Sequence, residues 1–113
     1  MEARAVTRGL RISPRKARLV ADVIRGKNVN EALQNILLSN RKGARMIRKT
    51  LESAIANAEN SYNVDVDDLF VVRATIDMGP SMRRLRPRAM GRADIVRRPT
   101  SHVTIVVGDK RGE

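Results

Sequence analysis

Apolar residues recur at helical spacing in three stretches of the first half of the chain. The first stretch places four of them on one face: Ala17, Val20, Ala21 and Ile24. Ser13-Pro14 precedes it, and serine is a good N-cap while proline suits the first helical position. Gly26 is suited to the position just after the helix, where a left-handed backbone often ends it. The pattern predicts a helix between these two signals.

Two more helices are predicted further along. The second has a continuous apolar stripe: Val29, Ala32, Leu33, Ile36 and Leu37. Asn28 with Glu31 resembles a capping box at its start. The third keeps one apolar face for about four turns, made of Ala44, Ile47, Leu51, Ala54, Ile55 and Ala58. Asn40 can cap it, and its alanines permit close packing.

Three stretches have strand character instead: Ala3 to Ile12, Leu69 to Asp77 and Ser101 to Val107. In the middle one, apolar residues alternate with mostly polar ones: Phe70, Val72, Ala74, Ile76 and Met78. The return strand repeats the alternation with Val103, Ile105 and Val107. Alternation predicts strands with one face buried on helices. We therefore expect an α+β fold in which three helices pack on a three-stranded antiparallel sheet.

The stretch Met78 to Thr100 has a different composition, because it holds seven arginines, one acidic residue and too few apolar residues for a core. A structureless loop of this length is unusual in a compact domain, so we predict a long, protruding β-hairpin. Each strand of about ten residues reaches ~30 Å. Gly91 is expected at or near the tip. The chain is thus predicted to be one domain, with residues 1–77 and 101–113 as the body and 78–100 as the arm.

The charge of the chain is large and uneven. Its net charge is +11 over 113 residues; residues 1–49 carry thirteen basic and three acidic side chains, whereas residues 50–77 carry one and six. Nucleic acid is the partner that this pattern favours. Guanidinium groups suit bidentate phosphate contacts. The predicted RNA contacts are Arg4, Arg8, Arg11, Arg15, Lys16, Arg18, Arg25, Lys27, Arg41 and Lys42 in the body, and Arg83, Arg84, Arg86, Arg97 and Arg98 in the arm.

Several classes of function are disfavoured by what the sequence contains. With no cysteine and one histidine, there is no disulfide framework, zinc site or Cys/His nucleophile. His102 has no partner placed beside it by any motif, so no catalytic residue is assigned. Asp65, Asp67 and Asp68 lack the glycine and glutamate of a calcium-binding EF-hand. We expect no metal, no cofactor and no enzyme activity.

The aromatic content and the charge of the predicted helices indicate which class of nucleic acid the chain binds. Tyr62 and Phe70 are the only aromatic residues, so a base-stacking platform for single strands is lacking and folded RNA is the better target. The second helix has no basic residue, which argues against helix-turn-helix binding to DNA. No apolar run is long enough to span a membrane and the N-terminus does not begin a signal peptide. The chain therefore reads as cytosolic, with neither DNA nor a membrane as partner.

Seven short motifs stand out along the chain: Ile12 to Asp22 (ISPRKARLVAD), Ile24 to Lys27 (IRGK), Leu51 to Ala58 (LESAIANA), Asp77 with Gly79-Pro80, Pro87 to Ala89 (PRA), Gly91 to Asp94 (GRAD) and Thr100 to His102 (TSH). Together they resemble the bacterial large-subunit ribosomal protein twenty-two family. The resemblance runs from Ala3 to Val107 without a gap. Methionine at position 78 departs from the acidic residue that the family pattern has there.

The resemblance implies a body seated on 23S ribosomal RNA near the outer mouth of the peptide exit tunnel, with the hairpin lining the tunnel wall. It implies that the tip faces the nascent polypeptide in the lumen, beside ribosomal protein four: Arg88, Ala89, Met90, Gly91, Arg92 and Ala93. It also implies a role in early assembly of the large subunit, with other large-subunit proteins as neighbours. The alternative is a free-standing basic RNA chaperone or DNA-compacting protein, which would not co-sediment stoichiometrically with large subunits in high salt.

Overall fold

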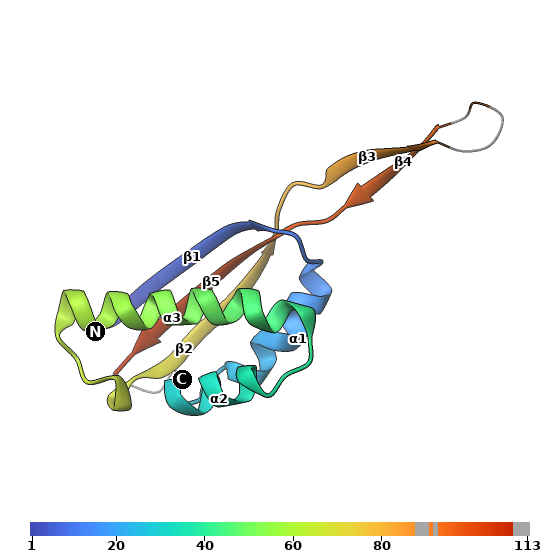
Figure 1. The fold of residues 1–113 in the computed structure, drawn as a ribbon. Coiled ribbons are helices and arrows are strands. Elements are labelled where there is room, and N and C mark those ends of the chain that lie inside the picture. The colour runs from blue at the N-terminus through green and yellow to red at the C-terminus, as the bar shows by residue number, and fades with distance from the viewer. Residues whose placement is uncertain (88–90, 92, 110–113) are drawn as a thin grey trace.

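The computed structural model describes residues 1–87, 91 and 93–109, and for residues 82–87 and 93–97 it describes the backbone (Figure 1). Nine elements follow one another along this part of the chain. They are β1 (Glu2–Leu10), α1 (Pro14–Ile24), α2 (Val29–Leu37), α3 (Lys42–Tyr62), the short 3-10 helix η1 (Val66–Asp68), β2 (Phe70–Met78), β3 (Met82–Pro87), β4 (Ala93–Arg98) and β5 (Ser101–Gly108).

Strands β1, β5 and β2 form an antiparallel sheet in which the C-terminal strand β5 lies in the middle. Figure 1 shows the helices gathered on one side of this sheet, with α3 running along it. Between the two layers lies the core, to which β5 contributes the fully buried Val103, Ile105 and Val107. The predicted α+β fold, three helices on a three-stranded antiparallel sheet, is confirmed.

Helix α1 begins and ends where the sequence predicts. Ser13 is its N-cap, and the Ser13 hydroxyl accepts a hydrogen bond from the Lys16 N–H at 3.4 Å. Pro14 occupies the first helical position. Gly26 follows the C-cap with φ of +73°, a left-handed conformation that glycine adopts without strain. The four apolar residues predicted to face the core are all buried.

Helix α2 is capped by Asn28, whose side chain accepts from the Asn30 N–H at 3.0 Å. Its stripe is shorter than predicted, because Leu37 is 62% exposed. The helix ends at Leu37, and the chain turns away before α3 can cover this last position.

Helix α3 buries all six residues of its predicted face. The prediction that Asn40 caps it was wrong, since the N-cap is Arg41, which makes no side-chain capping bond. The Ser39 hydroxyl instead accepts from the Arg41 N–H at 3.3 Å. At its other end α3 continues to Tyr62, and Asn63 closes it in the left-handed conformation with φ of 53°.

Strand β2 buries only part of the face that its alternation predicts. Val71 is fully buried before a register shift between Val71 and Arg73, and Ala74 and Ile76 are buried after it. This bulge adds one residue to the strand and moves the following side chains to the opposite face. Phe70 and Val72 were therefore predicted on the wrong face. Met78 was also predicted wrongly: it is 74% exposed where β2 leaves the sheet.

Strand β2 is an edge strand of the sheet, and the link between α1 and α2 lies along its free side. The Gly26 N–H donates to the Val71 carbonyl and the Val71 N–H donates to the Lys27 carbonyl, both at 2.9 Å. The Val29 N–H donates to the Leu69 carbonyl at 3.0 Å. These bonds cover backbone groups that would otherwise offer a template for unwanted strand pairing.

Strands β3 and β4 pair with each other and extend away from the body (Figure 1). Their register runs from Met82 opposite Arg98 to Pro87 opposite Ala93. The molecule measures 62 × 26 × 23 Å and has a radius of gyration of 16.9 Å, whereas a compact chain of this length would have about 13 Å. Of the predicted tip, Gly91 has φ of +71° and Ala93 begins β4, while Arg88, Ala89, Met90 and Arg92 lie outside the described residues.

Candidate nucleic-acid interface

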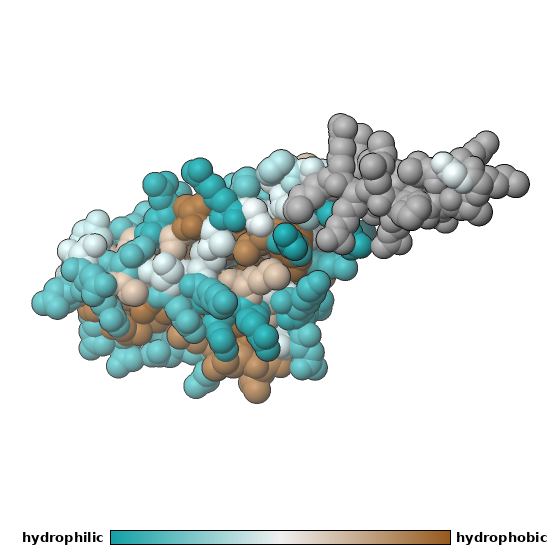
Figure 2. Space-filling model, turned by 45° about the horizontal axis from the view of Figure 1, so that its top comes forward, coloured by the Kyte–Doolittle hydropathy of each residue, from teal (hydrophilic) through white to brown (hydrophobic). Residues whose placement is uncertain are grey.

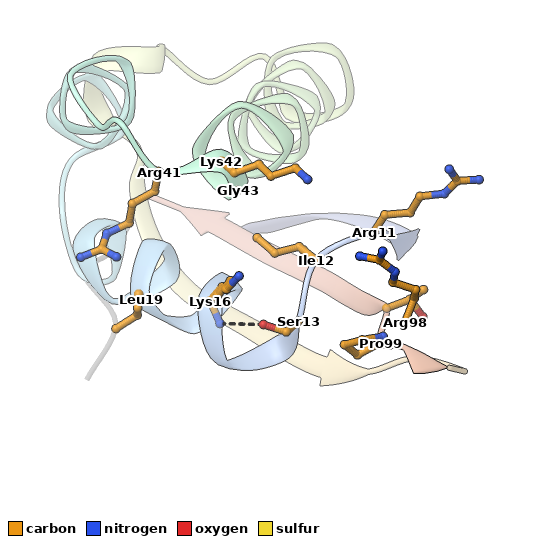
Figure 3. A pocket seen from close by; sticks show the side chains of 11 residues that line it. Arg11, Ile12, Ser13, Lys16, Leu19, Arg41, Lys42, Gly43, Arg98 and Pro99 are labelled. Carbon is orange, nitrogen blue, oxygen red and sulfur yellow. Dashed lines mark hydrogen bonds between the residues drawn. The ribbon is translucent and has the colours of Figure 1, made fainter. Parts of the chain in front are cut away.

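A basic hollow of about 730 Å³ lies where the arm leaves the body (Figure 3). We call it the root hollow. Its lining comes from the β1–α1 link, the first turns of α1, the start of α3 and the end of β4. Five cationic side chains line it, and none of the described lining residues is acidic: Arg11, Lys16, Arg41, Lys42 and Arg98.

Two helix N-termini open on the root hollow. The N-cap of α1, Ser13, and the N-cap of α3, Arg41, both belong to its lining. Neither helix has an acidic residue in its first turn. A helix N-terminus carries partial positive charge and free N–H groups, which adds to the potential of the five cations. The hollow is therefore suited to bind anionic groups.

The wall of the root hollow also has apolar parts. Ile12 is buried, and Figure 3 shows its side chain pointing toward Gly43 at the start of α3. A Cβ atom at Gly43 would overlap the end of the Ile12 side chain, so glycine allows α3 to begin this close to the β1–α1 link. Leu19 is 46% exposed on the α1 side. The root hollow thus has one exposed large apolar side chain beside its five cations.

Two hydrogen bonds of Thr100 hold together the two segments at the root of the arm. Its hydroxyl donates to the Pro80 carbonyl at 2.6 Å, and its carbonyl accepts from the Gly79 N–H at 2.9 Å. A Cβ atom at Gly79 would overlap the Thr100 hydroxyl. The two chain segments that enter and leave the arm are thus held in contact with each other.

The next two residues tie the arm root to the N-terminal part of the chain. The Ser101 hydroxyl, fully buried, donates to the Ile12 carbonyl at 2.6 Å. The His102 Nδ1 accepts from the Gly9 N–H at 3.1 Å. Gly9 has φ of +70° within the register shift of β1. Three consecutive side chains, Thr100 to His102, therefore fasten three separate segments together, and we call them the root clamp.

In the arm, the backbone register sets one pair of cationic residues directly opposite each other, Arg83 and Arg97. Arg86 lies opposite Asp94 instead, and Arg98 lies opposite Met82 at the end nearest the body. Like charges on directly opposite positions destabilise a two-stranded ribbon, which is itself marginal in water. A polyanion beside the arm would remove this repulsion.

Comparison with known proteins places the chain in a family. The family described as Ribosomal protein L22p/L17e matches residues 5–108. This chain belongs to that family. Its relatives include the large ribosomal subunit protein uL22 of Fusobacterium nucleatum, 55% identical over 98% of this chain and 100% of the relative. The protein of the same name from Thermoanaerobacter sp. is 54% identical over 97% and 99%. That of Thermus thermophilus is 50% identical over the full length of both chains.

The L22 family consists of ribosomal proteins and is not enzymatic. His102, the one histidine of the chain, lies in the root clamp, where its Nδ1 accepts from the Gly9 N–H. The described residues contain no group of three His, Cys, Asp or Glu that could hold a metal ion. No helix in the described part of the chain is long and apolar enough to cross a membrane.

Five of the fifteen residues predicted to contact RNA come together in the root hollow, as given above. Others lie elsewhere on the body. Arg4 and Arg8 are exposed on β1, and Arg15 is exposed at the start of α1. Lys27 is half-buried beside β2. The side chains of Arg83, Arg84, Arg86 and Arg97 lie outside the described part of the structure. All of these remain predictions for RNA contact.

Arg18 and Arg25 donate hydrogen bonds to the backbone of the body, which their charge alone does not predict. The Arg18 Nη2 donates to the Ile76 carbonyl at 3.3 Å, and the Arg25 Nε donates to the Ala74 carbonyl at 2.9 Å. Arg25 also pairs with Asp22 on α1. Arg18 lies on α1 and Arg25 is the C-cap of this helix, and both guanidinium groups reach the free edge of β2. Their hydrogen bonds satisfy further carbonyl groups on the free edge of β2, next to those bonded by the α1–α2 link.

Reasoning from sequence missed the root clamp and the root hollow as units. Their residues come from four separate elements, and no local pattern indicates that these elements meet. The only available signal was the Thr100-Ser101-His102 motif, three polar residues in a row where a buried strand should alternate.

Proposed function

We propose that this chain is a structural constituent of the large ribosomal subunit, in the cytoplasm, and that it binds 23S ribosomal RNA. The observation that carries the proposal is the root hollow, where five cations and two helix N-termini converge without an acidic residue among the described lining. The names of the relatives, each a large ribosomal subunit protein, support the same assignment.

The binding mode that we propose uses the backbone of folded RNA. Phosphates enter the root hollow beside Arg11, Lys16 and Lys42, while the exposed cations of β1 and α1 widen the contact. The arginines of the arm bind a second stretch of RNA, and this contact relieves the repulsion between the opposed Arg83 and Arg97. The root clamp joins the base of the arm to the body between these two contacts.

Family resemblance extends the proposal to the place of the chain in the subunit. The body, residues 1–77 and 101–113, lies near the outer mouth of the exit tunnel and takes part in early assembly. The arm, residues 78–100, lines the tunnel wall beside ribosomal protein four. Its tip, Arg88 to Ala93, faces the nascent polypeptide.

Co-sedimentation tests the assignment against a free-standing RNA chaperone or DNA-compacting protein. A tagged copy expressed in a bacterial host should sediment with large subunits at a stoichiometry near one and stay bound through a high-salt wash. Loss of the tagged copy into the supernatant at high salt, with wild-type subunits intact, would contradict the proposal. A protein bound by charge alone would be released from the subunit by high salt.

A further inference from the structure

Two leucines are exposed at the end of α2, on the opposite side of the α3 N-terminus from the root clamp. Leu37 is 62% exposed and Leu38 is 83% exposed. Figure 2 shows hydrophobic residues, in brown, at the lower edge of the body. Adjacent exposed leucines are unusual on a chain whose described surface is mostly hydrophilic.

Beside these leucines lies a second hollow of about 480 Å³, between the end of α2 and the first turns of α3. Ile36, Ala44 and Met46 supply apolar lining, and Leu37 lies at its edge. We call Leu37, Leu38 and this hollow the α2–α3 groove. Ile36 and Ala44 are buried and Met46 is half-buried, so the apolar floor is part of the core surface.

The rim of the α2–α3 groove is cationic. Arg41, Lys42, Arg45 and Arg48 line it, and no acidic residue does so among the described residues. Arg48 forms an ion pair with Glu52 whose N–O distance is 3.5 Å, longer than a good charge-assisted hydrogen bond. The Nε of Arg48 is shielded from solvent and has no hydrogen-bond acceptor within the described structure. The groove thus offers positive charge around an apolar floor.

An RNA strand fits this groove poorly. Leucine side chains gain nothing from a phosphate backbone, and the carbonyl end of a helix such as α2 carries partial negative charge that repels phosphate. The root hollow differs, because two helix N-termini line it, whereas the groove sets the N-terminus of α3 against the C-terminus of α2. A polypeptide can satisfy both features of the groove, since apolar side chains cover leucine while carboxylates pair with arginine.

We propose that the α2–α3 groove docks a segment of another protein of the large subunit, one that carries apolar side chains flanked by carboxylates. Its apolar residues cover Leu37 and Leu38, and its carboxylates pair with Arg45 and Arg48. The inference rests on the proposed function, because it places the partner within the assembled subunit.

Photo-crosslinking from position 38 tests this inference. Leu38 is replaced by p-benzoylphenylalanine in a tagged chain, large subunits are purified by sedimentation, and the irradiated products are mapped by mass spectrometry. The expected product joins position 38 to another ribosomal protein, within a segment that contains Asp or Glu. A product with ribosomal RNA, a product with a second copy of this chain, or no product from subunits that contain the tagged chain would overturn the inference.

Charge reversal in the same background tests the role of the rim. Arg45→Glu should lower the crosslinking yield about tenfold. The matched control Lys49→Glu, at an exposed position of α3 outside the groove, should leave the yield unchanged. Equal yields for the two variants would overturn the charge pairing and the proposal with it.

The sedimentation step separates this inference from the proposed function. If the unsubstituted tagged chain does not enter large subunits, the proposed function fails and this inference fails with it. If that chain enters and only the position-38 variant does not, the probe is moved to Leu37, where the same products decide the question.

Discussion

Ser101 shows how one buried hydroxyl holds two distant parts of the chain together. The side chain is fully buried at the start of β5 and bonds the Ile12 carbonyl 89 residues earlier in the sequence. Ser101→Ala should lower the free energy of unfolding by about 1–3 kcal/mol, because the Ile12 carbonyl loses its partner in a buried place. Urea denaturation of the purified chain measures this change.

The control for this prediction is Ser53→Ala, at an exposed position of α3. Its effect should stay within about 0.5 kcal/mol. If Ser101→Ala proved no more destabilising than Ser53→Ala, the hydrogen bond to Ile12 would contribute nothing to stability.

Alanines on α3 set how closely the helix approaches the sheet. Ala54 is fully buried, whereas Ala56 on the same helix is exposed. Ala54→Leu should overpack the core and lower stability by about 1–3 kcal/mol. Ala56→Leu makes the same chemical change on the outer face and should leave thermal melting nearly unaltered. Equal melting temperatures for the two variants would refute the assignment of the helix face.

At the scale of elements, Thr100 bonds together the two segments from which the arm leaves the body, and we expect these bonds to set the direction of the arm. Thr100→Val removes the hydroxyl that bonds Pro80 while keeping the shape of the side chain. We expect a broader distribution of distances between the body and the arm. The chain has no cysteine, so nitroxide labels can be attached to cysteines introduced at positions 53 and 86 and measured by pulsed electron spin resonance.

Thr75→Val serves as the control, because Thr75 is exposed on β2 and should not affect the arm. An unchanged distance distribution in Thr100→Val would show that the root clamp does not set the direction of the arm.

We expect the start of α3 to contribute to RNA binding through the root hollow. Lys42 lines the hollow, while Lys49, seven residues later on the same helix, does not. Each phosphate contact contributes about 0.7–0.9 to the slope of log affinity against log salt. Lys42→Gln should therefore reduce this slope for a 23S fragment by about one contact, and Lys49→Gln should not. A filter-binding titration with both variants would refute the role of the hollow if their slopes were the same.

For the whole molecule, we expect the body to fold without the arm, because the hydrophobic core does not depend on it. All residues of the core cluster among the described side chains belong to the body. Replacing residues 82–98 with a short glycine-serine turn should therefore leave the body folded, with a cooperative melt close to that of the full chain. The same variant should bind a 23S fragment more weakly and with a shallower salt slope, because the arginines of the arm are gone.

Circular dichroism and the same filter-binding titration measure both properties of the arm-less chain. Loss of cooperative melting would mean that the arm is part of the folding unit and that the division into body and arm is wrong.

The sequence alone determined the elements, because their signals are local. Ser13-Pro14 and Gly26 bound α1, and the apolar face of α3 follows from spacing along one helix. The concentration of arginine between Met78 and Thr100 likewise separated the arm from the core. Each of these features depends on residues that are close in sequence, so that periodicity, capping and composition suffice to find them.

The tertiary structure decided which of these residues act together. The bulge in β2 reversed the buried face after Val71, which alternation along the strand does not reveal. Arg18 and Arg25 have the charge of RNA contacts, yet both bond carbonyls on the edge of β2. The root hollow, the root clamp and the α2–α3 groove each join segments that are far apart in sequence. Contacts of this kind depend on how the helices and the sheet pack together, and no local pattern encodes that packing.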